Sequence, residues 1–201
     1  MTLEETLADS RRFAVLYGTT PPRADAPPER VHSAASRLAE RVADLPLDGL
    51  VVYDVQDESA RTAEPRPFPF LPTLEAPVYG RLLRELTGRP IVTYKCVATE
   101  TEESWPGWLD TASERDGVRF LSLVGLSSTK DARSCISLAR ASELAAAHRA
   151  GFVLGGVAIA ERHTPQRSES RRLLEKAERG CRYFITQAVY DAGPTIALLA
   201  D

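Results

Sequence analysis

Polar groups able to exchange protons or hydrogen-bond a ligand gather at the carboxyl-side ends of apolar, strand-like runs. In parallel α/β folds the catalytic and ligand-binding residues lie at that edge of the sheet. Five successive ends so equipped predict a shared pocket. In chain order the groups are Asp54, Gln56 and Asp57 at the end of run 49–55, Tyr94 in run 90–97, residues 127–129 after run 119–125, Glu161 and His163 after run 153–160, and Gln187 in run 183–189.

Two of these carboxyl groups, Asp54 and Asp57, are candidate acids or magnesium ligands. Magnesium favours carboxylates together with a substrate phosphate, and no phosphate-binding loop is evident. For two of the three carboxyl groups Asp54, Asp57 and Glu58, helix capping or pairing with Arg61 and Arg66 is the better interpretation. Glu161 and His163 lack the HExxH spacing of zinc sites. We therefore predict no metal centre.

The amide of Gln187 stands in an otherwise apolar run, FITQAV. A buried amide must find hydrogen-bond partners, and its donor and acceptor suit the lactam edge of a pterin or flavin. An equally good interpretation is that the Gln187 side chain points inward and its amide is hydrogen-bonded by backbone groups or water. Glu169 and Lys176 lie seven residues apart, which places them on one helix face roughly 10.5 Å apart; the plain interpretation is a solvated face. For His163, ligand contact and loop structure are evenly balanced.

Strand-like and helix-like segments alternate along the whole chain. Such alternation, with continuously apolar strands, predicts a parallel sheet covered by helices. A doubly wound sheet and a (β/α)8 TIM-type barrel both fit. No GxGxxG follows the first strand, and polar residues end nearly every strand, so the barrel is favoured. The predicted strands are 13–19, 49–55, 90–97, 119–125, 153–160 and 183–189, and helices are expected at 29–44, 76–87, 105–115, 135–150, between the last two strands and from 195.

The barrel predicted in this way is incomplete, because about six βα units are present where eight are needed. Residues 1–201 form one domain in this interpretation. An open barrel leaves two bare edge strands. Truncation of a longer chain at its C-terminus is the favoured explanation. The alternatives are that the last partial helix, the N-terminal arm or a second chain covers the edges, and the oligomeric state, a homo-oligomer included, stays open.

Bulk properties narrow the class of protein. The chain has 201 residues and a formal net charge of −3, with no massed basic patch, which argues against nucleic-acid binding. No apolar run is long enough for a membrane span, and the N-terminus lacks an apolar signal core. Three widely spaced cysteines are typical of free thiols in a cytoplasmic protein.

Several motifs resemble the methylenetetrahydrofolate reductase family over nearly the whole chain. They are GGVAIAERH from Gly155, FITQAVYD with the preceding Glu169, Lys176 and Gly180, and the segments VVYDVQDESAR, PRPFPF and YKCV. The resemblance implies a (β/α)8 barrel that reduces 5,10-methylenetetrahydrofolate to 5-methyltetrahydrofolate, with NADH or NADPH as hydride donor and FAD as carrier. It implies that Gln187 contacts the pterin, with Gln56 and Tyr94 as further substrate contacts. It also implies that His163, Glu169 and Lys176 lie near the flavin.

The same comparison shows departures from the family pattern. Gly18 holds the place of the family's acidic glutamate, and a glycine cannot protonate a substrate. Apolar residues replace other polar flavin contacts: Ile91, Val124, Leu126 and Ile159. Three interpretations follow, in order of preference. The first is a reductase with little or no bound flavin, whose acid is Glu161, Asp54 or Asp57. The second is an FAD-dependent reductase, and the third a non-catalytic folate-binding or complex-forming relative.

Overall fold

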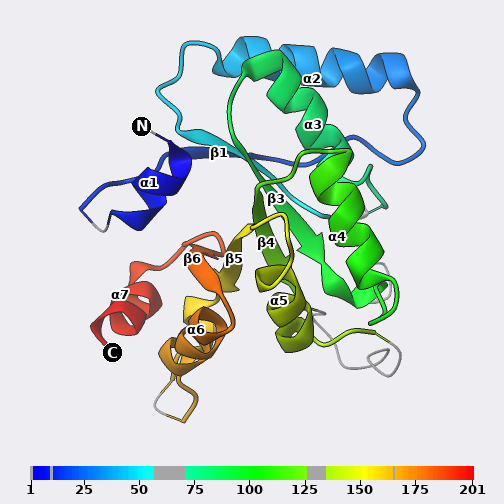
Figure 1. Cartoon of the computed structure of the whole chain (residues 1–201). Coiled ribbons are helices and arrows are strands. Elements are labelled where there is room, and N and C mark those ends of the chain that lie inside the picture. The colour runs from blue at the N-terminus through cyan, green and yellow to red at the C-terminus, as the bar shows by residue number, and fades with distance from the viewer. Residues whose placement is uncertain (1, 10, 57–70, 126–134, 165) are drawn as a thin grey trace.

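A computed structural model describes residues 2–9, 11–56, 71–125, 135–164 and 166–201. Within them, strands and helices alternate along the chain (Figure 1). The strands are β1 (Leu16–Thr19), β2 (Gly49–Val52), β3 (Ile91–Cys96), β4 (Phe120–Val124), β5 (Val153–Ala158) and β6 (Cys181–Thr186). The α-helices are α1 (Leu3–Ala8), α2 (Pro28–Val42), α3 (Ala76–Thr87), α4 (Trp105–Glu114), α5 (Leu138–Ala146), α6 (Glu169–Glu178) and α7 (Ala192–Ala200), and η2 (Val97–Thr99) and η4 (Ala160–Arg162) are short 3₁₀ turns.

The strands form one parallel sheet in the order β1-β2-β3-β4-β5-β6. A doubly wound sheet would reverse its strand order at a switch point, and this sheet does not. The sheet curls, with α2 to α6 around its outer side (Figure 1). Among the described residues β1 and β6 are the outer strands and do not pair with each other. The predicted barrel type is therefore confirmed as an α/β half-barrel of six strands.

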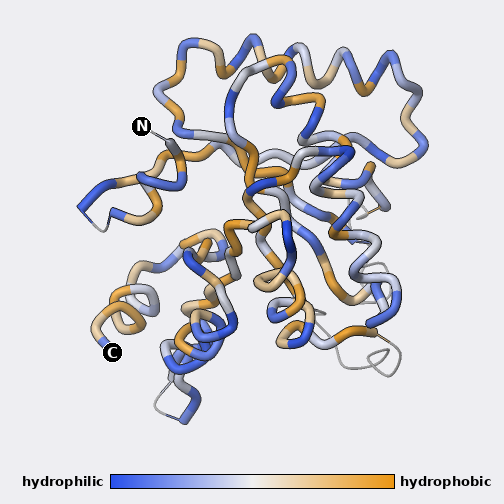
Figure 2. Tube along the Cα trace, viewed as in Figure 1, coloured by the Kyte–Doolittle hydropathy of each residue, from blue (hydrophilic) through white to orange (hydrophobic). Residues whose placement is uncertain are grey.

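Apolar residues on both faces of the strands explain why the sheet needs cover on both sides. On the outer face, Leu50 and Val52 of β2 pack against α2 and α3, and Leu121 and Leu154 pack against α4 and α5. The helices supply apolar stripes at helical spacing, which Figure 2 shows along α2 as alternating hydrophilic and hydrophobic residues. These outer clusters fix the spacing of the strands whose carboxyl ends form the site.

The inner face of the sheet carries its own core, which α1 partly covers. Leu3 of α1 packs there with Val51, Val92 and other inward residues. Glu4 ties α1 to the sheet by ion pairs with Arg119, at 3.0 Å, and Arg182, at 3.3 Å. This helix was missed from the sequence, although Thr2 and Glu5 form a capping box at its start. Its position leaves the opposite end of the inner face, at the strands' carboxyl ends, open to ligands.

A close approach inside the half-barrel depends on Gly155 of β5. A Cβ atom added there would lie 2.2 Å from a ring carbon of Tyr183, which is a severe clash. The absence of a side chain lets the Tyr183 ring lie directly over β5. The buried ring in turn fills the interior below the carboxyl ends of the strands.

Most predicted elements are present, with shorter bounds. The last strand ends at Thr186 instead of residue 189, so Gln187 lies just beyond β6 and is exposed. The premise that this amide is buried in a strand is therefore wrong. None of the helices in the described part of the chain has the length and apolar character needed to cross a lipid bilayer.

Candidate functional site

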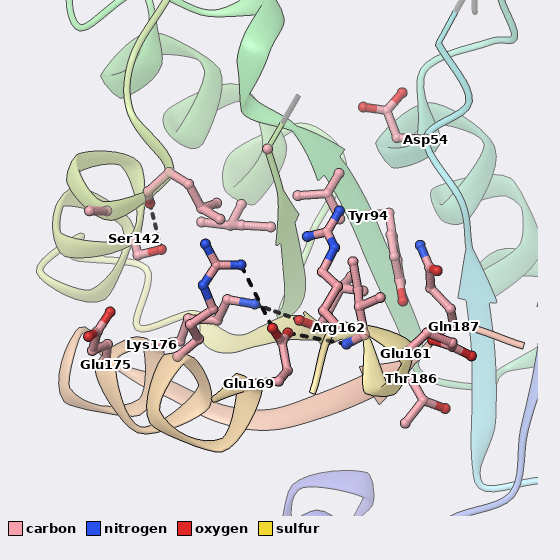
Figure 3. A pocket seen from close by; sticks show the side chains of 18 of the residues that line it. Asp54, Tyr94, Ser142, Glu161, Arg162, Glu169, Glu175, Lys176, Thr186 and Gln187 are labelled. Carbon is pink, nitrogen blue, oxygen red and sulfur yellow. Dashed lines mark hydrogen bonds and ion pairs between the residues drawn. The ribbon is translucent and has the colours of Figure 1, made fainter. Parts of the chain in front are cut away.

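A cavity of about 1000 Å³ opens at the carboxyl ends of the strands. One part, which we call the mouth side, is lined by Tyr53, Asp54, Tyr94, Glu161, Thr186 and Gln187. The other part, the helix side, lies against α5 and α6 and is lined by Ser142, Glu169, Arg172, Glu175, Lys176 and Arg179. Arg162 also lines the cavity and stands between the two sides in Figure 3. The predicted pocket at the strand ends is thus present, and Asp54 and Gln187 border the same space.

Asp54 follows β2 and is held in a fixed position by its neighbours. Its Oδ2 accepts a hydrogen bond from the backbone N–H of Cys96 at 2.7 Å, and its Oδ1 accepts one from Gln56 Nε2 at 2.6 Å. Burial raises the pKa of the Asp54 carboxyl, and the bond from Cys96 only partly opposes this. A carboxyl of this kind keeps its proton to a higher pH than an ordinary aspartate. Of the two candidate acids with described positions, Asp54 is more buried than the exposed Glu161.

Two tyrosines form an aromatic wall on the mouth side. The rings of Tyr53 and Tyr94 meet edge to face, with centroids 5.1 Å apart and an interplanar angle of 71°. Burial raises the pKa of Tyr94 to about 12, with the neighbouring Tyr53 as a smaller cause. The Tyr94 phenol therefore offers the cavity flat apolar surface rather than charge, and the Tyr53 ring extends that surface.

The Tyr53 ring lies over Gly18, in the space that a side chain at that position of β1 would occupy. A Cβ atom at Gly18 would lie 2.6 Å from the Tyr53 hydroxyl oxygen and 2.8 Å from a ring carbon. A glutamate at this position would have to displace the Tyr53 ring. The departure from the reductase pattern at Gly18 is therefore built into the packing of the mouth side.

Glu169 and Lys176 lie together on the helix side, as their spacing on one helix face predicts. Glu169 is 2% exposed, and its Oε1 accepts a hydrogen bond from the backbone N–H of Ile159 at 3.2 Å. Lys176 Nζ donates to the carbonyl of Val157 at 2.5 Å. Burial lowers the pKa of Lys176, while the nearby Glu169 opposes this shift. The interpretation of these residues as a solvated helix face is wrong for Glu169.

The remaining predicted residues divide into three groups. Glu161 and Gln187 are exposed at the rim of the cavity. Gln56 and His163 do not line it: Gln56 holds Asp54, and His163 Nδ1 accepts a hydrogen bond from the Glu169 N–H at 3.4 Å. Asp57, like Glu58, Arg61, residues 127–129 and the segment PRPFPF, lies outside the described residues.

On the helix side the sequence analysis named only Glu169 and Lys176 and missed the other lining residues. Arg172 lies three residues after Glu169 and four before Lys176, so all three share one face of α6. That spacing was a usable signal. Ser142 of α5 offered none, because its place depends on how closely α5 and α6 approach each other.

A magnesium site needs several oxygen ligands gathered around one point. No group of three or more His, Cys, Asp or Glu side chains that could hold a metal ion exists among the residues with described positions. Asp54 accepts hydrogen bonds from Cys96 and Gln56, and Glu169 lies on the other side of the cavity. Among the described residues these two carboxyl groups therefore do not converge on one point, as magnesium ligands would.

Comparison with known proteins gives structural matches only. No protein-family model and no curated protein matches the sequence. A solved structure described as an uncharacterised protein from Clostridium thermocellum that binds two copies of 5-methyl-5,6,7,8-tetrahydrofolic acid is 28% identical, with a TM-score of 0.80 over 99% of this chain. This chain covers 63% of that protein's length.

Two enzymes share the fold at lower identity. A phosphonopyruvate hydrolase, solved with oxalate and Mg²⁺, is 15% identical with a TM-score of 0.64, over 100% of this chain and 69% of the hydrolase. A 2,3-dimethylmalate lyase, a member of the PEP mutase/isocitrate lyase superfamily, is 9% identical with a TM-score of 0.63, over 99% of this chain and 64% of the lyase. At these identities the likeness shows the fold alone.

These matches correct the family prediction. None of the similar structures compared is a methylenetetrahydrofolate reductase, so the predicted membership of that family is contradicted. The predicted reductase activity and its cofactors, NADH or NADPH and FAD, are wrong for the same reason. The motif around Gln187 covers the end of one strand. Proteins that catalyse different reactions can have similar residues at such a position. The comparisons establish an α/β half-barrel of the TIM-like kind found in the PEP mutase/isocitrate lyase superfamily.

Proposed function

We propose that this chain binds a reduced folate, 5-methyltetrahydrofolate or a close analogue, in the cavity at the carboxyl ends of its strands. The observation that carries the proposal is the likeness to the Clostridium thermocellum protein, which extends over 99% of this chain and is described as binding two copies of that folate. The structure solved with oxalate and Mg²⁺ is 15% identical to this chain, so it supports the fold and not a metal-dependent reaction.

The mouth side has the chemistry that a pterin requires. A pterin is flat and presents donors and acceptors side by side along its aminopyrimidinone edge. The Gln187 amide supplies one donor and one acceptor, and the Asp54 carboxyl supplies acceptors. Tyr53 and Tyr94 add an aromatic wall against which a flat ring packs. We propose these four side chains as the pterin contacts.

Isothermal titration calorimetry with 5-methyltetrahydrofolate tests the proposal. Replacing Gln187 by Ala removes hydrogen bonds to the pterin edge and should weaken binding roughly tenfold. Gln166→Ala is a matched control, because Gln166 is also exposed but does not line the cavity. Absence of binding by the unaltered chain, or equal affinity of the Gln187 and Gln166 variants, would contradict the proposal.

A further inference from the structure

The helix side of the cavity contains a buried carboxyl group with unused hydrogen-bonding capacity. Glu169 Oε2 accepts no hydrogen bond from a described residue, although Glu169 is only 2% exposed. The nearest cation, the Arg172 guanidinium, stands 3.8 Å away, which is too far for a hydrogen bond. The Lys176 ammonium group donates its hydrogen bond to the carbonyl of Val157 and not to Glu169 Oε2. A buried acceptor left in this condition is costly and calls for a partner.

The position of this acceptor separates it from the proposed pterin site. Glu169 lies at the start of α6 on the helix side, whereas Gln187 and Asp54 lie across the cavity on the mouth side, with Arg162 between them (Figure 3). The total volume of about 1000 Å³ is at the upper end of pockets that hold one small molecule, roughly 300–1000 Å³. The cavity therefore has room and polar groups beyond what one pterin on the mouth side would use.

The surroundings of Glu169 define the kind of group that would satisfy it. Apolar side chains from α5, from β5 and from the residue after β5 line the cavity: Leu138, Ala139, Val157 and Ile159. A flat ring with N–H donors fits between such side chains and places its donors on Glu169 Oε2. Arg172, Lys176 and Arg179 line the same side and supply positive charge for a carboxylate tail. A folate carries both parts, an aminopyrimidinone ring with adjacent N–H donors and a glutamate tail.

We propose that Glu169 anchors a second pterin subsite on the helix side, so that the cavity holds two reduced folates at once. This inference rests on the proposed function and adds to it a second site with a named anchor. The ring of the second folate donates to Glu169 Oε2, and its tail lies along the basic side chains of α6. The folate on the mouth side keeps its contacts with Gln187 and Asp54.

Glu169→Gln tests the second subsite with little disturbance of the fold. A glutamine retains an oxygen that can accept from the Ile159 N–H, but it presents an NH₂ group where the ligand donors point. Calorimetry with 5-methyltetrahydrofolate should show two molecules bound to the unaltered chain. In Glu169→Gln the second binding event should weaken roughly tenfold or more, while the first remains. Glu178→Gln, on the same helix but outside the cavity, is the matched control and should still bind two.

A second variant keeps the test decisive if Glu169→Gln does not fold. Ala139→Leu adds bulk to a residue that lines the cavity and leaves Glu169 itself unchanged, and should also reduce the number of bound folates from two to one. Two folates bound with unchanged affinities in both variants would overturn the second subsite. One folate bound to the unaltered chain would overturn it as well, yet would leave the proposed function standing. No folate bound to any form would refute the proposed function itself.

Discussion

Replacement of Asp54 by Ala should destabilise the protein, because Asp54 connects the ends of two neighbouring strands. Its carboxyl accepts the backbone N–H of Cys96 at 2.7 Å and the Gln56 amide at 2.6 Å. Cys96 is buried, so its N–H would lose its partner without gaining water. An orphaned buried donor costs about 1–3 kcal/mol. For a chain of this size that corresponds to a fall of about 2–12 °C in melting temperature.

The loss should depend on pH in a defined direction. Burial raises the folded-state pKa of Asp54 above the ordinary value of 3.8. A raised pKa means that the folded state binds the proton more tightly than the unfolded chain does. The ionised carboxylate therefore costs stability at neutral pH, and this cost disappears as the pH falls through the folded-state pKa toward 3.8. The difference in unfolding free energy between the unaltered chain and Asp54→Ala should thus be larger in mildly acidic buffer than at pH 7.

Urea denaturation followed by circular dichroism, at pH 7 and in mildly acidic buffer, measures this difference. Comparing the two proteins at each pH cancels the titration of all other groups. A difference that shrinks as the pH falls would mean that the folded state favours the ionised form of Asp54. That result would refute the assignment of Asp54 as a buried carboxyl with a raised pKa.

Two further substitutions test the packing that positions the site. Gly155→Ala should cost about 1–3 kcal/mol or more, because the added Cβ would lie 2.2 Å from the Tyr183 ring. Gly107→Ala, where an added Cβ meets nothing within 4 Å, is the control, and equal melting temperatures of the two variants would contradict the prediction. Arg89→Ala should cost about 2 kcal/mol in urea denaturation, because the Arg89 guanidinium donates to four carbonyls at the end of α2 and in the turn before β2. An unchanged denaturation midpoint would show that these hydrogen bonds contribute nothing to stability. The four carbonyls belong to Val42, Ala43, Leu45 and Leu47.

The sequence predicts the sheet well because its strands are short, continuously apolar runs between helices. The residue at which a strand ends is harder to predict, because it depends on where the neighbouring strand stops pairing. The apolar run around Gln187 continues to Val189, yet β6 ends at Thr186, opposite Ala158 at the end of β5. Beyond that pair β5 offers only its last carbonyl, which accepts from the Gln187 N–H.

The site was easier to predict on its mouth side than on its helix side, where only Glu169 and Lys176 were named from the sequence. Strand periodicity and the parallel sheet bring Asp54 and Gln187 to the same edge, as predicted. The burial of Glu169 depends on the approach of α6 to β5 and α5, which no local pattern records. The predicted reaction was wrong for a different reason. A motif of a few residues reports the contacts at one strand end, and those contacts do not specify the reaction.

The most direct test of folate binding is a crystal structure of this chain with 5-methyltetrahydrofolate at saturating concentration. The proposal predicts electron density for a pterin on the mouth side of the cavity, with its aminopyrimidinone edge within hydrogen-bond distance of Gln187 and Asp54. A cavity without ligand density, or a folate bound only at another surface, would contradict it.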